Sequence, residues 1–174
     1  MNRSFDPTTR LEIQTFVVTH PGASAREVQR SLSLGWGETA YHLDQLLATS
    51  TLMRERAGRR DYFFPKDTKL EDRRLHIAFQ SSAERALLLT LVKDPDLSFS
   101  ELADQLRMSK STLSFHLKFL VATGSVRIST VAGVRRYHLD QPDRVKQLYR
   151  KYRSSWGDRW IDRFTSAFGG IMRD

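Results

Sequence analysis

The stretch SKSTLSFHLKFLVATGSV, residues 109–126, combines hydroxyl, cationic and aromatic side chains in a short helical pattern. A helix with hydroxyls and an ammonium on one face, and free N–H groups at its N-terminus, suits the major groove of DNA. Hydroxyls bond to phosphates or base edges, Lys binds guanine or phosphate, and an exposed Phe can touch a thymine methyl group. The candidate base-reading residues are Ser109, Lys110, Ser111, Thr112, Phe115 and Lys118.

The same stretch also has an apolar face. At 100° per residue, Leu113, Leu117 and Leu120 fall in one sector, so we expect them in the core of a small module. The plainer alternative is that the Ser and Thr residues only cap the helix while Phe115 packs against a neighbour. His116 lies beside the core sector, and we expect a partly buried histidine hydrogen-bonded to the backbone rather than a ligand.

The chain repeats itself at an offset of 74 residues. The segment GASAREVQRSLSLGWGETAYHLDQLLATSTL, from Gly22, aligns with DLSFSELADQLRMSKSTLSFHLKFLVATGSV, from Asp96. Beyond these segments, one inserted residue in the second copy would set Gly58 opposite Gly133 and Tyr62 opposite Tyr137. The alignment predicts one module used twice.

Each copy carries the same order of local signals. The first helices are predicted to begin at Asp6-Pro7 and at Ser81-x-x-Glu84, and the earlier one carries Leu11, Ile13, Phe16 and Val17. Capping boxes then start short second helices, at Ser24-x-x-Glu27 and Ser98-x-x-Glu101. After a tight turn, third helices begin at Gly35 and Ser109 and are followed by two β-prone runs around a glycine. The predicted fold class is mainly α with small β wings (α+β), as two winged helix-turn-helix modules in tandem.

Residues 109–139 resemble the recognition helix and wing of ArsR-type winged-helix repressors. The pattern of small hydroxyls, an apolar residue, His-Leu-Lys and a terminal Gly is present here as SKSTLSFHLKFLVATG. The first copy resembles this family less well, and the double module is similar to tandem archaeal regulators. The resemblance implies a DNA-binding transcription regulator.

The first copy has a different face on its third helix. Gly37, Glu38, Tyr41 and Asp44 take the place of the hydroxyls and the lysine, and its carboxylates would repel phosphates. We therefore expect this helix to read a groove less well, with Asp44 free to pair with a cation elsewhere.

Arginines gather on both predicted wings. Arginine near a wing tip can grip phosphates or enter a narrow minor groove, although it also keeps solvent-exposed edge strands from aggregating. The candidates are Arg54, Arg56, Arg59 and Arg60 on the first wing, and Arg127, Arg135 and Arg136 on the second.

An amphipathic helix is expected after Pro142, followed by the aromatic run WGDRWIDRFTSAFGGIM. The apolar sector of this run is open to three locations: a dimer interface, the chain's own core or a membrane surface. We favour the dimer interface, since mixed Asp and Arg on the polar side do not suit anionic lipid. The residues assigned to it are Trp156, Trp160, Ile161, Phe164 and Phe168.

These patterns divide the chain into four parts. Residues 1–66 form the first module and residues 67–80 a linker that can be helical. Residues 81–140 form the second module, expected to be the DNA reader, and residues 141–174 the C-terminal helices.

The composition and the motifs that are missing exclude several classes of function. A net charge of +8 favours a polyanionic partner, and the absence of cysteine excludes thiol chemistry. The five histidines lack ligand spacing, and no P-loop, GxSxG or dinucleotide-binding turn is present, so we expect no metal, no cofactor and no enzyme. Without a membrane span or an apolar signal segment, a cytoplasmic location is expected. The leading hypothesis is a homodimeric regulator that binds double-stranded DNA; the alternative is a tandem winged-helix scaffold for protein partners.

Overall fold

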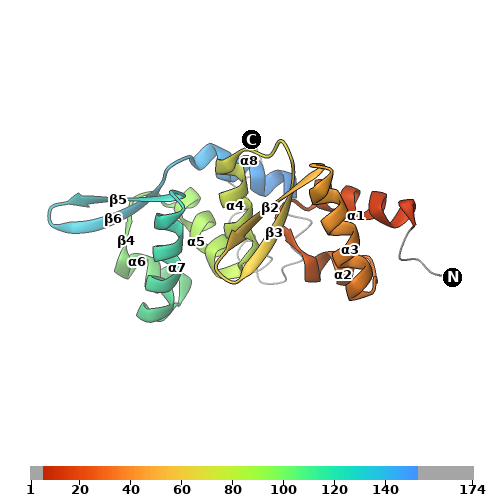
Figure 1. Ribbon diagram of the computed structural model, residues 1–174. Helices are drawn as coiled ribbons and strands as arrows, with labels where there is room; N and C mark the ends of the chain where they lie inside the picture. Colours follow the sequence, from red (N-terminus) through yellow and green to blue (C-terminus); the bar gives the residue numbers. More distant parts are fainter. Residues whose placement is uncertain (1–5, 153–174) are drawn as a thin grey trace. The chain divides into compact units, whose positions relative to one another are not determined.

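A computed structural model describes residues 6–152 of the chain (Figure 1). The chain divides into two compact units, residues 1–77 and residues 78–174. Each unit contains one copy of the repeated module, with its own three-stranded antiparallel sheet. The predicted fold class is confirmed.

The first unit is a winged helix-turn-helix. Its elements are α1 (Pro7–Thr19), β1 (Ala23–Ser24), α2 (Ala25–Ser31), α3 (Trp36–Ala48), β2 (Leu52–Ala57) and β3 (Arg60–Pro65). The strand order is β1-β3-β2, so that β2 and β3 form the wing and β1 joins the wing to the helices. A further helix, α4 (Leu70–Gln80), occupies most of the predicted linker.

The second unit repeats this order. Its elements are α5 (Ser82–Lys93), β4 (Leu97–Ser98), α6 (Phe99–Leu106), α7 (Lys110–Ala122), β5 (Val126–Val131), β6 (Val134–Leu139) and α8 (Pro142–Tyr152). The strand order is β4-β6-β5. The amphipathic helix expected after Pro142 is α8, and its Val145, Leu148 and Tyr149 are buried.

The two backbones match at the same offset through the wings. β1 pairs Ala23 with Phe63, and β4 pairs Leu97 with Tyr137, so Tyr137 corresponds to Phe63. The prediction of an inserted residue was therefore wrong. The glycine simply occupies a different place in the two-residue turn, since Gly58 opens the first turn whereas Gly133 closes the second.

Left-handed backbone recurs at matched positions although the residues differ. Ser33 and Arg107 have φ of 53° and 50° between the second and third helices. Ser50 and Gly124, which follow the third helices, have φ of 53° and 76°. Because the same bends recur with different side chains, tertiary packing of the module fixes these turns.

Helix caps set the start of each second helix as predicted. In both copies the Ser side chain accepts from the Glu N–H and the Glu side chain accepts from the Ser N–H, at Ser24 with Glu27 and Ser98 with Glu101. Only half of the predicted arrangement is present at α5, where Ser81 accepts from the N–H of Glu84. The carboxylate of Glu84 points elsewhere, as described below.

The cores consist of the predicted apolar faces with one exception. In the first unit Ile13, Val17, Leu43 and Leu46 are buried together with residues of α2 and the wing. Leu11 is 61% exposed, so its predicted place on the inward face of the first helix was wrong. Leu11 lies two residues from Ile13, which turns it about 200° away from the buried side.

The wings differ in what covers their outer face. In the first unit α4 lies over this face: Arg73 Nε is 3.1 Å from Glu55 Oε2, and the rings of His76 and Phe64 are 6.3 Å apart. In the second unit the helix that follows the wing, α8, packs instead on α5. The outer face of the second wing keeps Val131 and Val134 exposed, at 60% and 45%.

Candidate nucleic-acid interface

The N-terminus of α7 is built by Ser109. Its Oγ accepts from the N–H of Thr112 at 3.2 Å and lies 2.8 Å from Thr112 Oγ1 and 3.0 Å from Ser111 Oγ. This cap satisfies one of the free N–H groups of the first turn and gathers three hydroxyls at the helix start. Ser109 is therefore engaged as a cap, while Ser111 and Thr112 remain exposed beside it.

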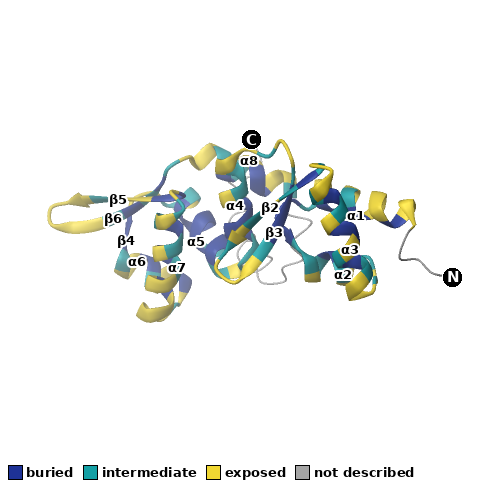
Figure 2. Cartoon of the chain, in the orientation of Figure 1, coloured by how far each residue is buried: buried dark blue, intermediate teal, exposed yellow. Residues whose placement is uncertain are grey.

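The two faces of α7 separate as the helical pattern predicts. Leu113, Leu117 and Leu120 are buried, with no more than 3% of their surface exposed. On the other side Phe115 is 70% exposed, and Lys110, Ser111, Thr112 and Lys118 are exposed as well. Figure 2 shows buried and exposed segments alternating along α7. The alternative that Phe115 is buried against a neighbour does not hold, because most of its surface is exposed.

His116 was predicted to bond to the backbone, and this prediction was wrong. Its Nδ1 lies 2.8 Å from Oε1 of Glu84, a buried carboxylate in the first turn of α5. The carboxylate of Glu84 contacts α7 instead of closing the capping box of its own helix. This contact ties α7 to α5. The ring of His116 also meets the ring of Phe115 edge to face, with centroids 5.2 Å apart.

A buried guanidinium, that of Arg85, directly follows Glu84 in the sequence. Arg85 is 3% exposed and donates from Nη1 to the carbonyl of Phe79. Burial lowers the pKa of Arg85 to about 10, against the opposing influence of Tyr149 and Glu84. No sequence pattern predicts this cluster, because its members come from four different helices: α4, α5, α7 and α8.

The third helix of the first unit presents different chemistry. Gly35 caps α3 without a side-chain hydrogen bond, in the place that Ser109 takes on α7. Its outward residues include Trp36 and Tyr41, 54% and 39% exposed, together with exposed Asp44. Sequence reasoning missed Trp36, although its position matches Lys110 at the repeat offset.

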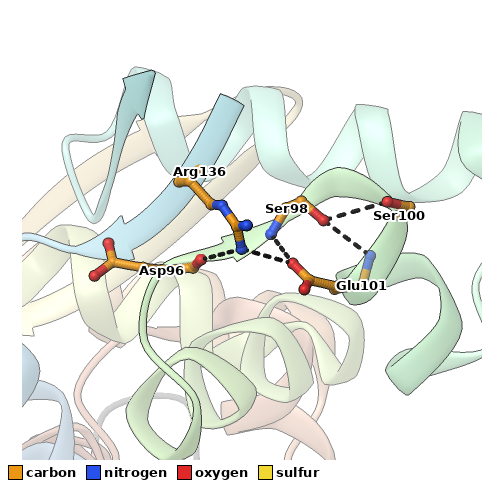
Figure 3. A network of polar contacts seen from close by, with 5 residues as sticks. All are labelled: Asp96, Ser98, Ser100, Glu101 and Arg136. Atoms are coloured by element: carbon orange, nitrogen blue, oxygen red, sulfur yellow. Dashed lines mark hydrogen bonds and ion pairs between the residues drawn. The ribbon is translucent and has the colours of Figure 1, made fainter. Parts of the chain in front are cut away.

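The three arginines of the second wing fall into two groups. Arg135 is exposed, and its side chain lies on the face of the ribbon that carries buried Tyr137 and Leu139. Arg127 Nε contacts Asp140 Oδ1, and Arg136 Nη1 lies 2.9 Å from Glu101 Oε2 (Figure 3). Two of the three predicted phosphate contacts are thus already paired with carboxylates of their own module.

The arginines of the first wing are more accessible. Arg56, Arg59 and Arg60 are exposed near the turn. Arg54 is also exposed, and its Nη1 lies 3.8 Å from Asp61 Oδ2 across the two strands. Asp61 occupies the position of Arg135, so the two wings carry opposite charges at that point of the ribbon.

The residues assigned to a dimer interface, Trp156 to Phe168, lie outside the described residues. Within residues 6–152 no group of three or more His, Asp or Glu side chains could hold a metal ion. A search of the described helices for one long and apolar enough to cross a membrane finds none.

Comparison with known protein families assigns both modules. Residues 7–75 match the family described as "HTH_HVO_0163_N, N-terminal HTH domain", and residues 82–127 match "Bacterial regulatory protein, arsR family". No curated protein matches the chain.

Several solved structures are similar to parts of the chain. A crystal structure of an ArsR family transcriptional regulator covers 51% of this chain and 93% of its own, with 23% identity and a TM-score of 0.37. The M. tuberculosis transcriptional regulator MosR covers 58% of this chain and 82% of its own, with 22% identity and a TM-score of 0.38. The DIP2311 protein from Corynebacterium diphtheriae covers 76% of this chain and 26% of its own, with 16% identity and a TM-score of 0.29.

The chain therefore contains two helix-turn-helix domains, and the second matches a family of transcription regulators. Its particular form is a tandem of two winged modules, of which the second is of the ArsR type.

Proposed function

We propose that the protein binds specific sites on double-stranded DNA as a homodimer and that its second module reads the bases. The single observation that carries this proposal is the outward face of α7, where Phe115 is 70% exposed beside Lys110 and Lys118. An aromatic side chain so exposed on a cationic helix favours a partner that buries it. A major groove, with negative phosphates at its edges and thymine methyl groups on its floor, meets both requirements.

Each side chain of this face has a distinct role in the proposed complex. Ser111 and Thr112, at the helix N-terminus, donate to phosphates or base edges. Lys110 and Lys118 neutralise phosphates or bind guanine, and Phe115 contacts a thymine methyl group. Arg135 adds a phosphate contact from the wing, with the exposed arginines of the first wing as a further set: Arg54, Arg56, Arg59 and Arg60.

We place the dimer interface in the aromatic tail, at Trp156, Trp160, Ile161, Phe164 and Phe168. Burying a large apolar side chain is favourable by about 1.5–3 kcal/mol, and a two-fold axis would present two reading helices to a palindromic site. Such a regulator acts where the genome is, which supports a cytoplasmic location.

The experiment is selection of bound duplexes from a random DNA pool, followed by affinity measurements at several salt concentrations. For the selected site, Lys118→Ala and Arg135→Ala should each lower the slope of log K against log salt by about 0.9. Lys93→Ala, at the far end of α5, is the matched control and should leave the slope unchanged. If the selection returns no common site, or both variants keep the wild-type slope, the proposal is wrong.

A scaffold that binds protein is the second candidate, and exposed Trp36 and Tyr41 on the acidic face of α3 favour it for the first module. Gel filtration with and without duplex DNA separates the two functions. A pure scaffold elutes at the same volume in both cases at moderate salt, whereas a DNA-binding regulator shifts.

A further inference from the structure

The second wing is attached to the start of α6 by a polar network (Figure 3). From its place on β6, opposite Ser98 of β4, Arg136 sends Nη1 to Glu101 Oε2 at 2.9 Å and to the carbonyl of Asp96 at 3.1 Å. Glu101 Oε2 also accepts from the N–H of Ser98 at 2.7 Å. One guanidinium thus joins the wing to the capping box of α6 and to the left-handed turn at Asp96, which has φ of 61°.

The described part of the first module has no guanidinium at the position of Arg136. Tyr62 occupies the position of Arg136 and is buried at 8% exposure. Glu27, the partner of Ser24 in the first capping box, accepts from the Ser24 N–H and hydroxyl, both at 2.7 Å. The first wing is instead held by buried aromatic rings and by contacts with α4.

We infer that Arg136 is a positioning residue, which latches the second wing to α6 through Glu101 and the Asp96 carbonyl, while Arg135 on the opposite face contacts the phosphate. Successive side chains of a strand point to opposite faces, so Arg135 and Arg136 leave the ribbon on opposite sides. This inference rests on the proposed function for its DNA-binding readout. It reassigns Arg136, which the sequence placed among the phosphate contacts.

The charge around Arg136 supports this assignment. Nη1 of Arg136 already donates to a carboxylate and a carbonyl, so a phosphate that bound Nη1 would have to replace both partners. Arg135 is exposed, and within residues 6–152 its guanidinium has no ion pair with a carboxylate. The two adjacent arginines therefore have different proposed roles, and the same substitution made at each position can distinguish positioning from phosphate contact.

The first test compares Arg136→Met with Arg135→Met in the full chain. We measure duplex affinity against salt and, in the absence of DNA, hydrogen exchange of the β5 and β6 amides. Arg136→Met should speed exchange in both strands and lower affinity about fivefold, roughly 1 kcal/mol, with the salt slope reduced by much less than 0.9. Arg135→Met should lower the slope by about 0.9 and leave exchange unchanged. The inference is overturned if Arg136→Met lowers the slope by about 0.9 with unchanged exchange, or changes neither quantity.

The second test substitutes Glu101, the partner of Arg136. The two possible roles of Arg136 predict opposite changes in DNA affinity. Glu101→Gln keeps an acceptor for the Ser98 N–H but removes the charge that holds Arg136. Asp104→Asn, an exposed carboxylate on the same helix, is the matched control for the loss of one negative charge. If Arg136 is a latch, Glu101→Gln binds DNA more weakly than Asp104→Asn; if Arg136 is a phosphate contact restrained by Glu101, Glu101→Gln binds more tightly.

Two further readouts keep the conclusions apart. A residue that only stabilised the fold would shift the unfolding midpoint and leave the affinity of the folded protein unchanged. If the wild-type protein binds no duplex, the proposed function fails, while faster exchange in Arg136→Met still supports the latch and unchanged exchange still refutes it.

Discussion

The two modules have the same backbone fold, but different contacts hold the third helix and the wing in each. In the first, His42 of the third helix is buried and makes no hydrogen bond within residues 6–152, and the wing is held by aromatic packing and α4. In the second, the corresponding histidine pairs with Glu84 and the wing is held by charged side chains on its surface. The fold thus depends on the apolar pattern that both copies keep, whereas the polar contacts are free to differ.

The same contrast holds for the outward face of the third helix. Lys118 of α7 occupies the position of Asp44 on α3, and Lys110 the position of Trp36. A duplicated fold therefore presents a cationic, hydroxyl-rich ridge in one copy and an acidic, aromatic one in the other. This difference supports our proposal that the second module reads the bases, because phosphates attract a cationic ridge and repel an acidic one.

The largest expected effect compares the equivalent core leucines Leu120 and Leu46, which are 0% and 2% exposed. Leu120→Ala and Leu46→Ala should each destabilise their own unit by about 2–5 kcal/mol, because each leaves a cavity in a small core. Denaturant unfolding followed by hydrogen exchange assigns the loss to a unit. Only Leu120→Ala should abolish DNA binding, and equal losses of binding in both variants would contradict the division of labour.

The histidines give the next largest effect. His116→Leu leaves the buried Glu84 carboxylate without its partner, and we expect a loss of roughly 1–3 kcal/mol in the free energy of unfolding. In the described part of the chain both ring nitrogens of His42 are buried without a hydrogen bond, so His42→Leu should be neutral or stabilising. Denaturant midpoints of the two variants check this difference in sign, and destabilisation by His42→Leu would refute it.

A smaller effect concerns the outer face of the first wing. Arg73→Ala removes the contact with Glu55 at 3.1 Å and the packing of its stem, for which we expect a loss of about 1 kcal/mol. Exchange at the β2 and β3 amides should quicken, since α4 holds this face. Arg74→Ala, an exposed neighbour on the same helix, is the control. Unchanged exchange in Arg73→Ala would mean that the aromatic contacts hold the wing unaided.

The sequence predicted the parts of this molecule that local rules govern. Capping boxes at Ser24 and Ser98 are local contacts between residues three apart, and the leucines of α7 follow the helical period, so both were confirmed. The ribbon alignment was wrong because a glycine was matched to a glycine. Two-residue turns accept left-handed backbone at either position, and Ala132, with φ of 50°, takes one of them here.

Contacts between elements could not be predicted in the same way. The partner of His116 lies 32 residues away on α5, and the partners of Arg136 lie 35 and 40 residues away. A single sequence gives side-chain types but not which of several carboxylates a cation meets. For this reason the arginines of the second wing could be named as a group but not sorted into contact and latch.

The smallest expected effect is a titration. Hydrogen bonds from the side chain and backbone of Ser98, followed by the charge of Arg136, lower the pKa of Glu101 from its ordinary value. A carboxylate with a depressed pKa in the folded state stabilises the fold above its unfolded pKa, and this contribution is lost as the pH falls through the folded pKa. The contact between Glu101 and Arg136 should therefore persist below the ordinary pKa of glutamate and open only when the pH falls through the lower pKa of the folded state.

Chemical-shift titration of the Glu101 carboxyl carbon measures this pKa directly, and Ser98→Ala should move the pKa upward because it removes the largest influence. A larger upward shift in Arg136→Met than in Ser98→Ala would instead make the guanidinium the main partner of Glu101, and the capping box the lesser one.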